Sequence, residues 1–179
     1  NTQSGTNGVT DSAAAGTALS TGCKSHNGSL GVLTDKVTPV TSIAKWAQDA
    51  GAAVGITTSV TVDHATPAAF YAHVGGRKEY YKIGQQLIES QYDFFAGSDF
   101  YAPKNPVEGG ADLYVQAQQG GYTIAKGYNN YQKLSKKADK IILFQSDVAN
   151  KKDHKCLPYA IDRTKNDLSL SDITRASIN

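Results

Sequence analysis

The feature that most constrains the fold of this chain is an alternation of short apolar segments with amphipathic ones. Residues 52–60 and 92–96 are short, apolar and rich in β-branched or aromatic side chains, as buried strands are. Between them, residues 78–90 place their apolar side chains at helical spacing. Strands that alternate with helices of this length predict an α/β fold, layered α/β/α, with a largely parallel sheet.

The same signals extend along the rest of the chain. Further helices are expected at residues 11–21, 39–50, 66–73, 112–119, 129–137 and 171–179, and further strands at 122–125 and 140–145. Two other stretches, residues 97–110 and 146–168, are expected to be long loops. No internal repeat interrupts this order.

Composition and charge disfavour several function classes. The formal net charge is +2 and no basic–aromatic repeat is present, so nothing indicates nucleic acid as a partner. No apolar run reaches the length of a membrane span, and the first residues carry no signal-peptide pattern. The lysines between Lys133 and Lys155 are interpreted as a solvated face rather than an anion-binding patch. Cys23 and Cys156 leave open a single disulfide or two buried free thiols.

The stretch VTDSAAAGTAL, residues 9–19, has two interpretations. As an ordinary helix start, Asp or Ser caps the first turn and the alanines have high helix propensity. As a nucleophile site, a serine at a helix N-terminus lies beside free backbone N–H groups that can hold an anion. Both interpretations place Asp11 and Ser12 at the start of a helix, and these residues alone do not separate them.

A second stretch, TVDHATPAAFYAHVGGR (residues 61–77), directly follows the first predicted strand. Loops after parallel strands are where α/β proteins collect their chemistry. Asp63, His64 and Thr66 offer oxygen and nitrogen ligands for a metal. Arg77 offers a planar cation that suits a tetrahedral oxyanion. Taken singly, such a histidine is more often a capped loop residue and such an arginine a surface charge. Together with the acid–hydroxyl helix start, they are the groups that phosphoryl transfer needs.

These two stretches resemble the corresponding segments of the alkaline phosphatases. The similarity runs from VTDSAAAGTALSTG through KSHNGSLGV and DHATPAAFYAHVGGR to QQLIES and FFAGSDF, and it ends with DLSLSDITRASIN. The resemblance covers essentially the whole chain, whereas the chain covers well under half of the family's catalytic domain. We therefore expect residues 1–179 to be part of a single alkaline-phosphatase catalytic domain, truncated at both ends, with an incomplete form of that fold.

The resemblance implies a role for each matching residue. Ser12 would be the nucleophile that carries the phosphoryl group as a covalent intermediate, and it would also be a metal ligand. Asp11 would orient Arg77, and Arg77 would bind two phosphate oxygens. Thr66 would bind the magnesium-type third metal. His64 falls where family members carry either aspartate or histidine, and because imidazole favours zinc or cobalt over magnesium, the identity of that metal stays open.

The resemblance also implies cofactors and partners. The full-length parent is expected to be a zinc- and magnesium-dependent hydrolase of phosphate monoesters, a homodimer, and a periplasmic or extracellular protein. The ligands of the zinc pair lie in family segments outside this chain, and His26, His73 and His154 match no ligand motif. The alternative is that the chain as given is a catalytically incomplete fragment, at best a weak anion-binding module. A sulfatase-like enzyme and a Ser–His–Asp hydrolase are both disfavoured, because the modified-cysteine motif and the G-x-S-x-G elbow are absent.

Overall fold

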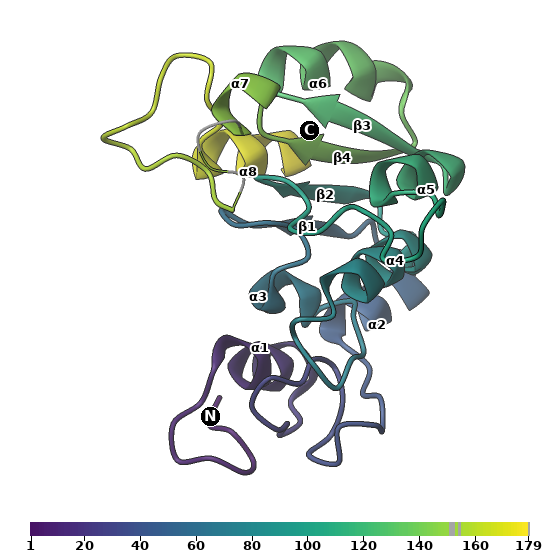
Figure 1. Cartoon of the computed structure of the whole chain (residues 1–179), viewed down its shortest axis with the longest axis vertical. Coiled ribbons are helices and arrows are strands. Elements are labelled where there is room, and N and C mark those ends of the chain that lie inside the picture. The colour runs from purple at the N-terminus through teal and green to yellow at the C-terminus, as the bar shows by residue number, and fades with distance from the viewer. Residues whose placement is uncertain (151–152, 154, 179) are drawn as a thin grey trace. The chain divides into compact units, whose positions relative to one another are not determined.

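The computed structural model describes residues 1–150, 153 and 155–178 of the chain (Figure 1). The chain divides into two compact units. The first unit consists of Asn1–Val54 and Asp63–Ser90, and the second consists of Gly55–Val62 and Gln91–Asn179. The first unit carries the candidate site residues, and the second carries the sheet.

The second unit is built on a four-stranded sheet in which all neighbouring strands are parallel (Figure 1). The strands lie in the order β1 (Gly55–Thr57), β2 (Phe94–Gly97), β4 (Lys140–Phe144) and β3 (Tyr122–Lys126). Runs of apolar residues such as those of β2 and β4 are typical of parallel strands, which are covered on both faces. The prediction of an α/β fold with a parallel sheet is confirmed.

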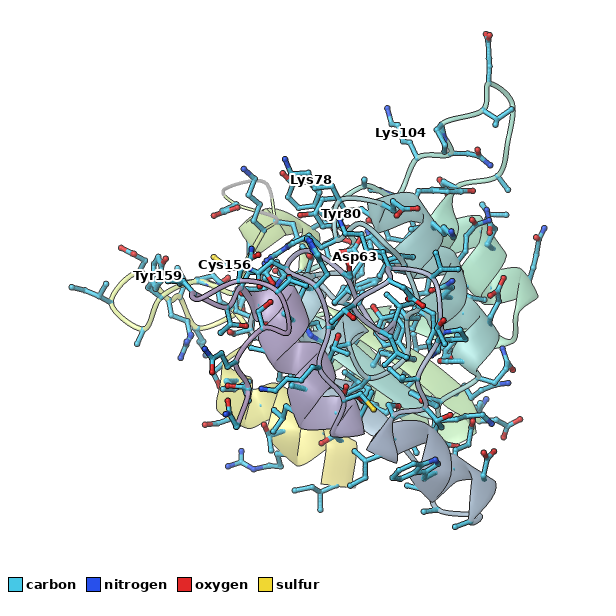
Figure 2. All side chains as sticks on the ribbon, turned by 90° about the horizontal axis from the view of Figure 1, so that it is seen from below. Asp63, Lys78, Tyr80, Lys104, Cys156 and Tyr159 are labelled. Atoms are coloured by element: carbon cyan, nitrogen blue, oxygen red, sulfur yellow. The ribbon has the colours of Figure 1, made fainter. Side chains whose placement is uncertain are left out.

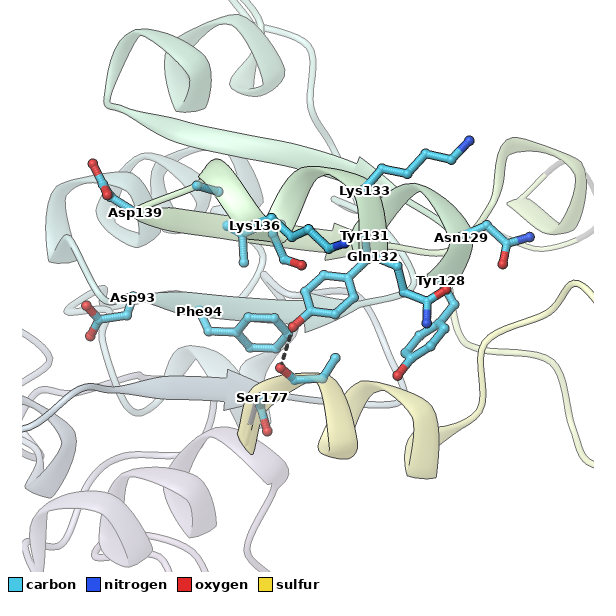
Figure 3. Close-up of a pocket in the computed structure, with 14 residues that line it drawn as sticks. Asp93, Phe94, Tyr128, Asn129, Tyr131, Gln132, Lys133, Lys136, Asp139 and Ser177 are labelled. Atoms are coloured by element: carbon cyan, nitrogen blue, oxygen red, sulfur yellow. Dashed lines mark hydrogen bonds between the residues drawn. The ribbon is translucent and has the colours of Figure 1, made fainter.

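Two helices cover one face of this sheet. There, α6 (Tyr128–Leu134) and α8 (Leu170–Ile178) share one apolar cluster with the strands. The buried members of that cluster are Phe94, Ala96, Ala125, Tyr131, Ile141, Leu143, Leu157, Leu168, Ile173 and Ala176. Within it, the Tyr131 ring meets Phe94 edge-on, and the Tyr131 hydroxyl donates to the Ala176 carbonyl at 2.7 Å (Figure 3). This hydrogen bond ties α6 to α8.

The opposite face carries the alternate residues of the same strands, because successive side chains of a strand point to opposite sides. Phe95 and Phe144 are fully buried, and α5 (Leu113–Gln119) packs against β3. The Phe144 ring lies 5.1 Å from that of Phe100 and 6.0 Å from that of Tyr114 on α5. Helices on both faces give this unit the predicted α/β/α layering.

The first unit is helical and is packed through small side chains. Its helices are α1 (Ser12–Thr21), α2 (Ile43–Asp49), α3 (Ala65–Ala68) and α4 (Tyr80–Ser90). Ala13 and Ala14 of α1 are fully buried, and α1 packs against α3. A Cβ atom added at Gly16 would lie 2.9 Å from the Cβ of Ala69, a distance too short for ordinary contact. The alanine and glycine content of α1 therefore permits this close helix packing.

Several predicted elements are confirmed in kind but are shorter than predicted. The strand expected at 52–60 is reduced to β1, because it pairs with β2 over only three residues. The helix expected at 39–50 is reduced to α2, since the Ser42 Oγ caps its start by accepting from the Lys45 amide at 3.2 Å. The helix expected at 66–73 is reduced to α3, which spans 4 residues.

The C-terminal half shows smaller differences. Among its described residues, the loop expected at 146–168 includes a short helix, α7 (Asp147–Asn150), and residues 151, 152 and 154 of this expected loop lie outside the described residues. The helix expected at 129–137 is α6 followed by the 3-10 turn η1 (Ser135–Lys137). The last predicted helix is α8, which begins one residue earlier than expected.

Two further expectations concern the cysteines and the membrane. Cys23 and Cys156 are free thiols, and both are half-buried rather than fully buried. Burial, together with the neighbouring Asp153 carboxylate, raises the pKa of the Cys156 thiol. Among the described residues, no helix has both the length and the apolar character that a bilayer crossing requires.

Candidate active site

The start of α1 presents an acid and a hydroxyl side by side. Asp11 is the N-cap, and its Oδ1 accepts from the Ala14 amide at 2.9 Å. Ser12 is the first residue of the helix and is exposed. Within the part of the chain that the structure describes, no group hydrogen-bonds to the Ser12 hydroxyl. The helix-cap interpretation is therefore confirmed for Asp11, and it leaves the Ser12 hydroxyl free for chemistry.

Asp11 also holds Arg77. Its Oδ2 lies 3.1 Å from Nη1 of Arg77 and accepts from the Gly28 amide at 3.1 Å as well. Burial opposes ionisation of Asp11, but the amides of Ala14 and Gly28 and the Arg77 guanidinium outweigh it and lower the pKa of this carboxyl. The Asp11 carboxylate therefore favours its ionised form and is paired with the guanidinium.

The second guanidinium nitrogen of Arg77 faces His64. Its Nη2 lies 3.4 Å from Nε2 of His64, the N-cap residue of α3. Burial first, and then the positive charge of Arg77, lower the pKa of His64, so its imidazole is neutral near pH 7. Among the described residues the buried Nδ1 of His64 has no hydrogen-bond partner. Buried polar atoms are normally paired, and a neutral imidazole is the form that binds metals.

The other predicted metal ligands lie on the same loop but in different environments. Thr66 is exposed on α3. Asp63, which is labelled in Figure 2, is fully buried. Burial, and after it the charge of Asp63, raise the pKa of the Tyr71 hydroxyl well above its usual value. Asp63 thus lies among buried groups. The structure brings Asp11, Arg77 and His64 together, with Arg77 between the other two.

Metal-binding capacity is limited in this part of the chain. Over residues 1–150, 153 and 155–178, no group of three or more His, Cys, Asp or Glu side chains could hold a metal ion. His26 and His73 have structural contacts: His26 Nδ1 lies 2.7 Å from the Asn27 carbonyl, and His73 Nε2 lies 3.2 Å from the Val40 carbonyl. His154 lies outside the described residues.

The hydrogen bonds of Asp11 predict a pH-dependent contribution to stability. Because its pKa is lower in the folded chain than in the unfolded one, the carboxylate stabilises the fold above the unfolded value of 3.8, and this contribution is lost as the pH falls through the folded value. We expect wild type to exceed Asp11→Asn in free energy of unfolding by a constant amount above about pH 5, with the gap closing below about pH 4. Urea denaturation of both proteins in the presence of EDTA, at several pH values across this range, measures the difference in free energy of unfolding. A gap that stays constant or widens as the pH falls from about 5 would contradict the lowered pKa.

The fold and the site together define a class: an α/β protein with an exposed helix-start serine beside an Asp–Arg pair. The chain belongs to the alkaline phosphatase family, whose model matches residues 1–179. Alkaline phosphatase 4 of Bacillus subtilis is 30% identical over 180 residues, which cover 96% of this chain and 36% of that protein. The chicken tissue-nonspecific alkaline phosphatase is 42% identical over 91 residues, covering 46% of this chain and 17% of that protein.

Solved structures agree in fold. The alkaline phosphatase of the Antarctic bacterium TAB5 superposes with a TM-score of 0.83 at 29% identity, covering 99% of this chain and 49% of that one. The Thermus thermophilus alkaline phosphatase superposes with a TM-score of 0.82 at 32% identity, and the match covers 99% of this chain and 36% of that one. The chain therefore spans about half, or less, of the length of these relatives.

Proposed function

We propose that the protein hydrolyses phosphate monoesters through a phosphoserine formed on Ser12. The observation that carries this proposal is the Asp11–Arg77 contact of 3.1 Å next to the exposed Ser12 hydroxyl. Family membership supports the same activity. Arg77 would bind two oxygens of the phosphoryl group, and Asp11 would keep the guanidinium aimed at them.

We further propose that His64 and Thr66 contribute to a third-metal site. The fit of these residues is partial: His64 supplies a neutral imidazole whose buried Nδ1 is unpaired among the described residues, and Thr66 supplies an exposed hydroxyl two positions on. A metal bound there would add positive charge beside the phosphoryl oxygens. Imidazole favours zinc or cobalt over magnesium. A histidine-to-aspartate mutant of the TAB5 enzyme has Mg bound in its M3 site, which fits this expectation for a carboxylate replacement.

The zinc pair of the family does not fit the described residues, which contain no three-ligand group of His, Cys, Asp or Glu. No step is derived through it. A homodimer and a periplasmic or extracellular location are proposed on family membership alone. The second candidate function, weak anion binding by the chain as given, is favoured by this shortage of ligands.

The test compares the 179-residue chain with the polypeptide as its gene encodes it, each refolded with zinc and magnesium. Bound metal is measured by atomic emission, and turnover is measured with a chromogenic phosphate monoester. We expect the gene-encoded polypeptide to hydrolyse the ester, and the 179-residue chain to bind zinc below stoichiometry without turnover above its Ser12→Ala variant. Stoichiometric zinc with Ser12-dependent turnover in the short chain would show that its site is complete.

A further inference from the structure

We propose that Asn27 and Gly28 are positioning residues that set the distance between the start of α1 and Arg77; the inference rests on the function proposed above. These two residues lie in the loop that follows α1 and were not singled out by their chemistry. They contact, by hydrogen bonds, both the segment that carries Ser12 and the segment that carries Arg77.

The Asn27 side chain bridges the backbone just before α1. Its Oδ1 accepts from the Asp11 amide at 3.2 Å, and its Nδ2 donates to the Val9 carbonyl at 2.8 Å. One side-chain amide thus fixes the backbone on both sides of Thr10, the residue before the cap. The path of the chain into Asp11 and Ser12 depends on this pair of hydrogen bonds.

Gly28 extends the connection to Arg77. Its amide donates to Asp11 Oδ2 at 3.1 Å, and its carbonyl accepts from the Arg77 amide at 2.6 Å. Gly28 has a φ of +81°, which favours glycine, and a Cβ atom there would meet nothing within 4 Å. The glycine is therefore required for its backbone conformation and not for lack of space.

The pairing continues away from the site. The Ser29 hydroxyl donates to the Gly75 carbonyl at 3.0 Å, and Leu30 and Val74 exchange two backbone hydrogen bonds of 2.9 Å each. The loop after α1 is thus paired in antiparallel register with the segment that leads into Arg77.

This backbone pairing fixes the spacing between the start of α1 and Arg77, which the Asp11–Arg77 ion pair alone does not fix. The Asp11 and Arg77 side chains are 28% and 26% exposed, so the pair is partly solvated, and this one side-chain contact does not by itself set the distance between the two backbones. Hydrogen bonds along two neighbouring backbones fix the spacing, and misplacement of a reacting group by about 1 Å can lower a rate about 100-fold. Asn27 and Gly28 would act through Ser12 and Arg77 without touching the substrate.

The experiment uses two substitutions with matched controls in the gene-encoded polypeptide. Asn27→Ala removes the amide bridge, and Gly28→Ala strains the backbone without a clash. In a loop of the other unit, Asn105 forms a similar bridge: its side chain accepts from the Val107 amide and donates to the Ala111 carbonyl. In the same loop, Gly109 has a φ of +76°, and a Cβ atom added there would meet nothing within 4 Å. Asn105→Ala and Gly109→Ala therefore match the chemistry and the strain of the two changes.

We expect both site variants to lose about tenfold in kcat/KM, with kcat and inhibition by inorganic phosphate both affected, and both controls to stay within about twofold of wild type. Amide exchange by NMR should be faster at position 28 and at Arg77 in both site variants and unchanged in α4. Wild-type kinetics in Asn27→Ala, or an equal loss in Asn105→Ala, would overturn the inference. If the wild-type polypeptide hydrolyses no phosphate monoester, the proposed function fails. The positioning role is then tested by amide exchange alone, and unchanged exchange at position 28 and at Arg77 in the two site variants would overturn it.

Discussion

Replacing Ser12 with alanine is expected to abolish covalent phosphate capture and to lower kcat by about a thousandfold or more, as loss of a nucleophile does. The expectation follows from the exposed hydroxyl at the first position of α1, next to the Asp11 cap. The change removes one oxygen atom, and alanine favours the helix. The fold should therefore be unaffected.

The measurement is an acid quench of the gene-encoded polypeptide during turnover of a substrate with labelled phosphate, followed by peptide mapping. Label should appear at Ser12 and be absent from Ser12→Ala. Ser171 offers a matched control, because it is also an exposed serine in the first turn of a helix, α8. Ser171→Ala should keep both label and rate. Label on a different residue in active wild type would rule out Ser12 as the nucleophile.

Replacing Arg77 should weaken phosphate binding even when the charge is kept. The guanidinium contacts Asp11 through Nη1 while Nη2 lies near His64, and a lysine ammonium cannot occupy both positions. We expect Arg77→Lys to raise the inhibition constant for inorganic phosphate by about 5- to 150-fold, which is about 1–3 kcal/mol. Catalytic efficiency should fall in parallel.

The control for Arg77 is Arg175→Lys, an exposed arginine in the last turn of α8, which should leave inhibition unchanged. Inhibition constants from steady-state rates at several phosphate concentrations give the comparison. Wild-type inhibition in Arg77→Lys would mean that Arg77 is an ordinary surface charge held by Asp11.

The sequence was sufficient to predict the fold class and the candidate residues. The apolar segments that became β2 and β4 are recognisable because burial on both faces demands continuous apolar residues. Asp11, Ser12, His64 and Arg77 stood out because their chemistry is unusual beside alanines and glycines. The contact between Asp11 and Arg77, 66 residues apart, was implied only by resemblance to a family.

Other features could not be predicted from local patterns. An Asn–Gly pair is a common turn signal, so Asn27 and Gly28 look like any loop tip until their long-range partners are seen. The length of β1 is set by its register with β2, which no residue of β1 encodes. The unpaired Nδ1 of His64 likewise depends on tertiary burial.

The three hydrogen bonds that the Asp11 carboxylate accepts have a consequence for proton transfer at the site. A carboxylate offers about four lone-pair sites, and here Ala14, Gly28 and Arg77 occupy three of them. Protonation of Asp11 would weaken the hydrogen bonds from these donors, which connect α1, the following loop and Arg77. These donors lower the pKa of Asp11, which makes it a poor base, so in the proposed reaction another group must receive the Ser12 proton.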